Sequence, residues 1–158
     1  MLVYMDVCCL NRPFDDQSFE RVRLESEAVL SILERCEAGE CQIAGSQAVA
    51  YEVARAGDSE RRRRVDMLAK TASVFTEVTQ AVEDRGVEIE GLGFSALDAL
   101  HLACAEAANA HVFLTTDDAL LARADRERSK LAVKVANPAT WLLGRKADWN
   151  EQTHGSDH

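Results

Sequence analysis

The sequence has little of what marks disordered, fibrous or multidomain chains. It contains only two prolines and eight glycines in 158 residues, and it shows no internal repeat at a solenoid period. Hydrophobic residues make up 47% and charged residues 28%, as in an ordinary globular protein. A chain of this length can bury one core without a metal or a disulfide, so we expect a single domain.

Long apolar runs and cysteine motifs are also missing. No run approaches the roughly 20 apolar residues that span a bilayer, and the opening run at residues 1–5 is too short for a signal peptide. We therefore predict a cytoplasmic protein with no membrane contact. The five cysteines form no CxxC pair, so free thiols in a reducing compartment are expected and a zinc site is not. They are Cys8, Cys9, Cys36, Cys41 and Cys104.

Positive charge is scarce. The net charge of -9 argues against a protein that holds nucleic acid mainly by neutralising phosphates. It does not exclude a nuclease, because divalent cations in an acidic pocket reverse the local charge. One basic run, Arg61 to Arg64, could contact phosphate, although the solvated face of a helix is the favoured interpretation.

Short apolar runs alternate with segments of helical periodicity. This alternation predicts an α/β fold, namely a three-layer α/β/α domain over residues 1–144 with a central parallel sheet of four to five strands. A polar, flexible tail is expected at 145–158. Loops are expected at 11–16 and 86–93. The expected strands are 2–5, 41–44, 73–78, 112–114 and 131–135, and the expected helices are 18–38, 46–57, 59–70, 79–85, 95–109, 119–128 and 137–143.

Acidic residues recur at the ends of these predicted elements. Asp6 closes the first strand and Asp117 follows the fourth, while Glu52 and Asp98 lie in early turns of helices that begin at Ser46 and Ser95. Parallel strands with right-handed crossovers bring their carboxyl ends to one edge, so we expect four carboxylates in one pocket. Their mutual repulsion is relieved by a hard cation, which makes Mg²⁺ or Mn²⁺ the expected occupant.

The order and spacing of these motifs resemble the PIN domain family. The similar segments are Val3-Tyr4-Met5-Asp6, the serine-initiated helix with Glu52, the run from Ser95 to Ala103, and Phe113-Leu114-Thr115-Thr116-Asp117, within a similarity that covers roughly residues 2–143. The resemblance implies a metal-dependent ribonuclease, often the toxin of a toxin–antitoxin pair of the VapC kind and commonly a homodimer. It also implies an RNA substrate and an antitoxin partner.

The resemblance assigns residue roles as well. Asp6, Glu52, Asp98 and Asp117 would form the catalytic, metal-binding set. Asn11, Ser46, Thr115 and Thr116 would support them, and Asp118 could replace Asp117 if the strand ended one residue later. The family often has Asn or Ser two residues after the first acid, where this chain has Cys8, a weak hydrogen-bonding residue. The supporting contact that such an Asn or Ser makes would be lost here or transferred to Asn11.

Simpler interpretations stay open at each position. Asp6, Asp98 and Asp117 could cap turns or helices, Glu52 could lie on a helix surface, and His101 is better explained as a packed histidine than as a ligand. Asp15, Asp16, Glu25 and Glu27 read as solvated charges. A catalytically silent PIN-like module that binds RNA or a protein partner is the main alternative function. A receiver-type phosphoacceptor is disfavoured because Asp6 has no acidic neighbour and Lys134 lies within the last predicted strand.

Overall fold

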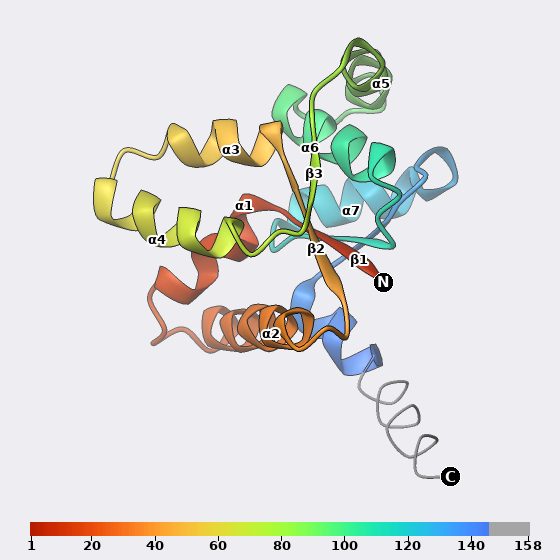
Figure 1. The fold of residues 1–158 in the computed structure, drawn as a ribbon. Helices are drawn as coiled ribbons and strands as arrows, with labels where there is room; N and C mark the ends of the chain where they lie inside the picture. Colours follow the sequence, from red (N-terminus) through yellow and green to blue (C-terminus); the bar gives the residue numbers. More distant parts are fainter. Residues whose placement is uncertain (146–158) are drawn as a thin grey trace, which may run out of the picture.

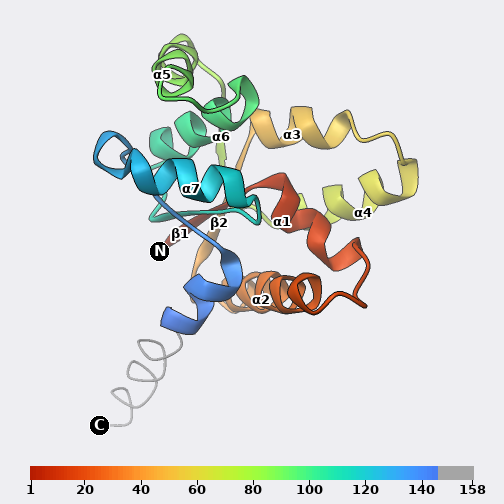
Figure 2. The ribbon, with the colours of Figure 1, turned by 180° about the vertical axis from the view of Figure 1, so that it is seen from behind.

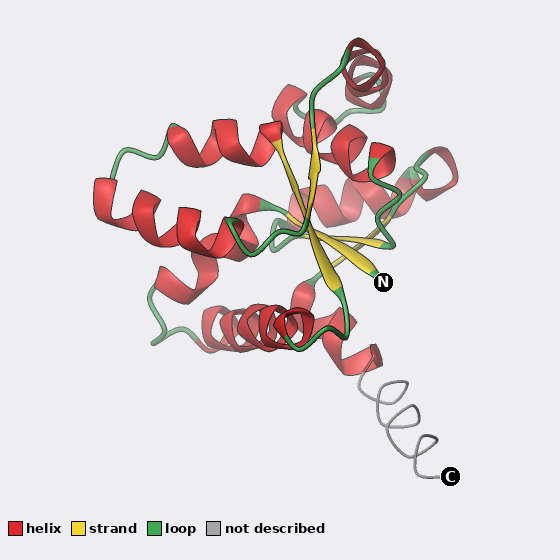
Figure 3. Cartoon of the chain, viewed as in Figure 1, coloured by secondary structure: helices red, strands yellow, loops and turns green. Residues whose placement is uncertain are grey.

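A parallel sheet of five strands forms the centre of the molecule, in the order β3-β2-β1-β4-β5. The computed structural model describes residues 1–145. Strands β1 (Leu2–Met5), β2 (Gln42–Ser46) and β4 (Val112–Leu114) are almost entirely buried, whereas the edge strands β3 (Val74–Thr76) and β5 (Lys134–Ala136) are partly exposed. The three-layer α/β fold with a parallel sheet, expected from the sequence, is confirmed (Figure 3).

Helices cover both faces of this sheet. Helix α2 (Glu20–Glu37) lies on one side of the strands, and α5 (Gln80–Glu90), α6 (Ala96–Ala107) and α7 (Asp118–Arg126) lie on the other (Figures 1 and 2). Helices α3 (Gln47–Ala54) and α4 (Ser59–Ala69) connect β2 to β3. A last helix begins at 138 and reaches 145, so Gly144 does not end it as expected. The predicted tail, apart from Arg145, lies outside the described residues.

The strand order indicates where on the sheet a ligand would bind. The chain moves from β1 outward to β3 and then returns to the far side of β1 to form β4, so the direction of winding reverses between β1 and β4. In open α/β sheets, ligands bind at the carboxyl ends of the strands at such a reversal. Tyr4 of β1 and Phe113 of β4 stack here, with ring centroids 5.2 Å apart, and fix the two strands side by side.

Several predicted boundaries were wrong. Residues expected to lead into a loop form helix α1 (Val7–Asn11) and a 3₁₀ turn (Arg12–Phe14), since Asp6 caps the segment and Pro13 fits a first helical turn. Helix α5 continues to Glu90 because Gly86 packs against Leu100 of α6 and its helix-breaking tendency is overridden. The last strand begins at Lys134 rather than at 131.

The cysteine prediction was also partly wrong. Cys36 and Cys41 form a disulfide between the end of α2 and the start of β2, where the sequence suggested free thiols. The turn at Gly39, with a φ of 88°, folds the chain back and brings the two residues together. Cys8, Cys9 and Cys104 are free. No helix within residues 1–145 is long and apolar enough to cross a membrane.

Candidate metal centre at the carboxyl edge of the sheet

Asp6 is the buried centre of the candidate site. It follows β1, caps α1 by accepting from the Val7 amide, and is almost inaccessible to solvent. Its Oδ2 accepts a hydrogen bond from the Thr115 hydroxyl at 2.8 Å and a longer one from the Cys8 thiol at 3.4 Å. Burial raises the pKa of Asp6, and the nearby His101 imidazole and the Thr115 hydrogen bond oppose that rise.

Glu52 and His101 face Asp6 from two helices. Ser46 caps α3 by accepting from the Val49 amide, and this start places Glu52 in the second turn of the helix. His101 is fully buried on α6, and its Nε2 lies 3.6 Å from Glu52 Oε1. One possible ligand atom from each of Asp6, Glu52 and His101 lies within 4.8 Å of the other two. Two oxygen donors and one nitrogen donor therefore converge at one point.

Asp98 and Asp117 lie at the margin of this cluster. Ser95 caps α6 and places Asp98 in its first turn, as predicted. Burial raises the pKa of Asp98, a hydrogen bond with Ser95 opposes the rise, and the nearby charges of Asp6 and Asp117 add to it. Asp117 caps α7 by accepting from the amides of Ala119 and Leu120. All four predicted acids are therefore linked electrostatically, since Glu52 affects the pKa of Asp6, and Asp6 and Asp117 both affect that of Asp98.

Asp118, the alternative to Asp117, is bound by Arg21 of α2. Both of its oxygens accept from Arg21 at 2.7 Å, and the side chain is exposed. The hydrogen bonds with Arg21 lower the pKa of Asp118. Asp118 therefore ties α7 to α2, while Asp117 lies close enough to Asp98 to affect its pKa.

The supporting residues differ in part from expectation. Cys8 keeps the contact with Asp6 and also accepts from the Thr116 amide at 3.3 Å, whereas Asn11 bonds to the Val7 carbonyl and to Arg61. Thr115 accepts from the Asp117 amide at 3.2 Å, so its hydroxyl joins two of the acids. The contact with the first acid, expected to be lost or to move to Asn11, is therefore made by Cys8.

Charged residues near the site were misread from the sequence. Glu25, expected in solvent, has a side chain that is only 3% exposed and pairs with Arg12 and Arg21. Arg12 and Arg61 bind Asp15, so Asp15 is not a freely solvated charge. These pairs connect the 3₁₀ turn to α2 through Glu25 and to α4 through Asp15. Polar residues in a long amphipathic helix give no sequence signal for such long-range pairing.

The Arg61 to Arg64 run is largely engaged within the protein. Arg61 binds Asp15 and the Phe14 carbonyl, and Arg64 binds Glu60 on its own helix. This agrees with the interpretation of the run as a helix face.

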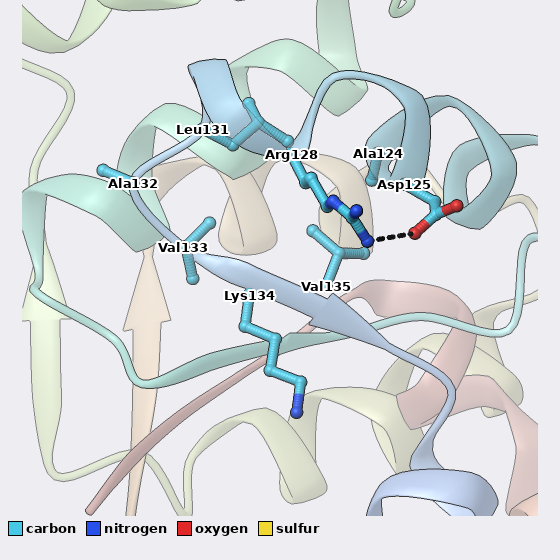
Figure 4. A pocket seen from close by; sticks show the side chains of 8 residues that line it. All are labelled: Ala124, Asp125, Arg128, Leu131, Ala132, Val133, Lys134 and Val135. Carbon is cyan, nitrogen blue, oxygen red and sulfur yellow. Dashed lines mark ion pairs between the residues drawn. The ribbon is translucent and has the colours of Figure 1, made fainter.

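A separate cavity lies away from the acids. It has a volume of about 480 Å³ and lies between the end of α7 and β5 (Figure 4). Arg128 and Asp125 form an exposed ion pair at its rim. None of the four predicted acids lines it, so its position gives no support to the metal centre.

The donor chemistry suits a divalent cation. Carboxylate oxygens and an imidazole nitrogen are ordinary ligands, and His101 Nε2 is buried without a hydrogen-bond partner among the described residues. A buried polar atom without a partner carries a free-energy cost that a ligand would remove. Asp6, Glu52 and His101 could hold an ion, with Asp98 and Asp117 beside them.

Comparison with known proteins gives a family and a fold. The family model of the PIN domain matches residues 12–127, a range that includes Glu52, Asp98 and Asp117. The chain is similar to the crystal structure of VapBC2 from Rickettsia felis bound to a DNA fragment from their promoter, with a TM-score of 0.58 and 16% identity over 87% of this chain and 98% of that chain. No curated protein matches. At this identity the structural similarity establishes the fold alone.

Proposed function

The chain belongs to the PIN domain family, and from that premise we propose that it is a divalent-metal-dependent endoribonuclease that hydrolyses RNA phosphodiester bonds. The observation that carries the proposal is the convergence of Asp6, Glu52 and His101 at the winding reversal of the sheet, with Asp98 electrostatically coupled to it. Nearby like charges disfavour the charged form of a carboxylate, and a bound cation would offset that repulsion.

Each residue has a distinct part in this proposal. Asp6 would hold the ion, and the Thr115 hydroxyl fixes its carboxylate. Glu52 is half-buried and would complete the ion's ligands or orient the attacking water. Asp98 and Asp117, which affect each other electrostatically, would add negative charge beside the ion. A bound divalent cation would supply Lewis-acid stabilisation of the negative charge on the phosphate and lower the pKa of a water.

The biological setting is proposed from the family and the fold. We assign the protein the role of the VapC-like toxin of a toxin–antitoxin pair that acts in the cytoplasm as a homodimer. The similarity to the VapBC2 structure supports an antitoxin partner for this chain. Such a partner would dock an apolar helix on the domain and place a basic side chain among the acids.

The proposal is tested by metal binding and RNA cleavage in parallel. Purified wild type and Asp98→Asn are titrated with Mn²⁺ by calorimetry and then incubated with a mixed-sequence RNA. We expect saturable binding and metal-dependent cleavage by the wild type, with products that carry a 5′-phosphate. No binding and no cleavage by either protein would point instead to a silent binding module.

A further inference from the structure

His101 is the feature of the site that the acidic motif does not explain. Its ring is completely buried, and Nε2 has no hydrogen-bond partner among residues 1–145. Nε2 lies 3.6 Å from Glu52 Oε1, and one ring nitrogen of His101 lies within 4.8 Å of a carboxylate oxygen of both Asp6 and Glu52. A histidine that served packing alone would bury a second nitrogen without compensation.

The other ring nitrogen is held in place by a buried chain of hydroxyls. Nδ1 lies 2.7 Å from the Tyr4 hydroxyl, which lies 2.7 Å from Ser46 Oγ. With Nδ1–H donating to Tyr4 and Tyr4 donating to Ser46, Nε2 keeps its lone pair and faces the acids. Metal-ligating histidines almost always donate their second N–H in this way.

The distances are close to those of ligands around one ion. Two ligand atoms about 2.1 Å from the same cation lie at most about 4.2 Å apart. The 3.6 Å between Nε2 and Glu52 Oε1 already meets this limit. The ligand atoms of the three residues lie at most 4.8 Å apart, so side-chain movements below about 1 Å would bring all of them within it.

We propose that His101 Nε2 is a direct ligand of the ion, together with Asp6 and Glu52, and that this nitrogen makes the centre prefer a first-row transition ion such as Mn²⁺ over Mg²⁺. The inference rests on the metal site of the proposed ribonuclease. Imidazole binds transition ions better than Mg²⁺, which favours carboxylates and water. A site of carboxylates alone would lack this selectivity.

A competing role for His101 uses the other tautomer. If Nε2 carries the proton, it would donate to Glu52 and only orient that carboxylate. The two roles differ in whether nitrogen touches the ion, which spectroscopy of the loaded protein reports directly.

The first test is pulsed EPR of the wild-type protein with one equivalent of Mn²⁺. We expect ¹⁴N modulation from a coordinated imidazole. Mn²⁺ that binds saturably without ¹⁴N modulation would overturn the inference and leave the proposed ribonuclease intact, because RNA cleavage is measured separately. Failure of the wild type to bind either Mn²⁺ or Mg²⁺ would contradict both the assignment of His101 as a ligand and the proposed metal-dependent ribonuclease.

Two variants at this position provide the matched comparison. His101→Asn keeps an amide near Nδ1 for Tyr4 but has no atom at Nε2, whereas His101→Gln can place an oxygen near Nε2. Since even outer partners of a metal site are worth 10–100-fold in affinity, Mn²⁺ should bind His101→Asn at least about tenfold more weakly. His101→Gln should retain Mg²⁺ while its Mn²⁺/Mg²⁺ affinity ratio falls.

The outcome is read from that ratio and from the fold of the variants. Thermal unfolding of the metal-free variants shows whether they fold, and the EPR result on the wild type does not depend on them. An unchanged Mn²⁺/Mg²⁺ affinity ratio in both folded variants would contradict the assignment of His101 as a ligand.

Discussion

Replacing Thr115 by valine tests how the acidic edge is held together. The Thr115 side chain is fully buried, and its hydroxyl donates to Asp6 Oδ2 at 2.8 Å while accepting from the Asp117 amide at 3.2 Å. Valine has nearly the same shape, so the change removes the hydroxyl and creates little cavity. The acid after β1 and the cap of α7 would lose their common partner.

The magnitude follows from these two bonds. A hydrogen bond to a charged acceptor contributes about 1.5–3 kcal/mol, and an amide left without its partner adds up to about 1 kcal/mol when it keeps some access to water. We expect Thr115→Val to lower the free energy of unfolding by about 2–3 kcal/mol at neutral pH. For a chain of this size, that corresponds to a fall in Tm of roughly 5–10 °C.

Urea unfolding of the metal-free proteins measures the effect. Thr116→Val is the matched control, since Thr116 contacts the Cys8 thiol rather than a carboxylate, and it should cost less than about 1 kcal/mol. Thr115→Ser keeps the hydroxyl and should recover most of the loss. Equal losses in Thr115→Val and Thr116→Val would refute the account of how Asp6 is held.

Three further predictions concern pH, buried charge and glycine. Burial raises the folded-state pKa of Asp6 and Asp98, so their contribution to stability is fully present below about pH 3.9 and is lost as the pH rises through the folded-state pKa. Metal-free Asp98→Asn lacks this loss at position 98 and should gain stability relative to the wild type as the pH rises. A series of unfolding curves at different pH values would show or deny this trend. Glu25→Gln should lower the free energy of unfolding by about 2 kcal/mol because it weakens bonds with two arginines, and a loss under about 0.5 kcal/mol in urea would contradict this. Gly86→Ala should stabilise α5 by about 0.5–1 kcal/mol, since an added Cβ would meet Leu100 at an ordinary 3.8 Å. Gly93→Ala should destabilise the protein, because the φ of Gly93 is 108°. Calorimetry should therefore show shifts in Tm of opposite sign for the two variants.

The fold was readable from local patterns. Central strands β1 and β4 are continuous apolar runs that stop at an acid or a threonine, and Ser46 and Ser95 mark helix starts through their side-chain caps. These signals lie within a few residues of one another along the chain. The end of α5 was misjudged because packing at Gly86 overrides the local preference of glycine, and the last helix also continues past Gly144 to residue 145.

The site was only partly readable. The placement of Asp6 and Asp117 follows from strand ends, but the burial of Glu25 and the pairing of Asp118 with Arg21 depend on residues about 100 positions apart. His101 illustrates the same limit. Its spacing from Asp98 fits a packed helix residue, and only the three-dimensional structure shows its free nitrogen directed at Glu52.

The most direct test of the central claim is the rate of RNA cleavage by wild type and Asp98→Asn under matched metal concentrations. We expect cleavage by the wild type that EDTA abolishes, and a rate at least about 100-fold lower in the folded variant, since metal-site residues outside the first ligands are already worth 10–100-fold. Metal-dependent cleavage by pure Asp98→Asn at the wild-type rate would contradict it.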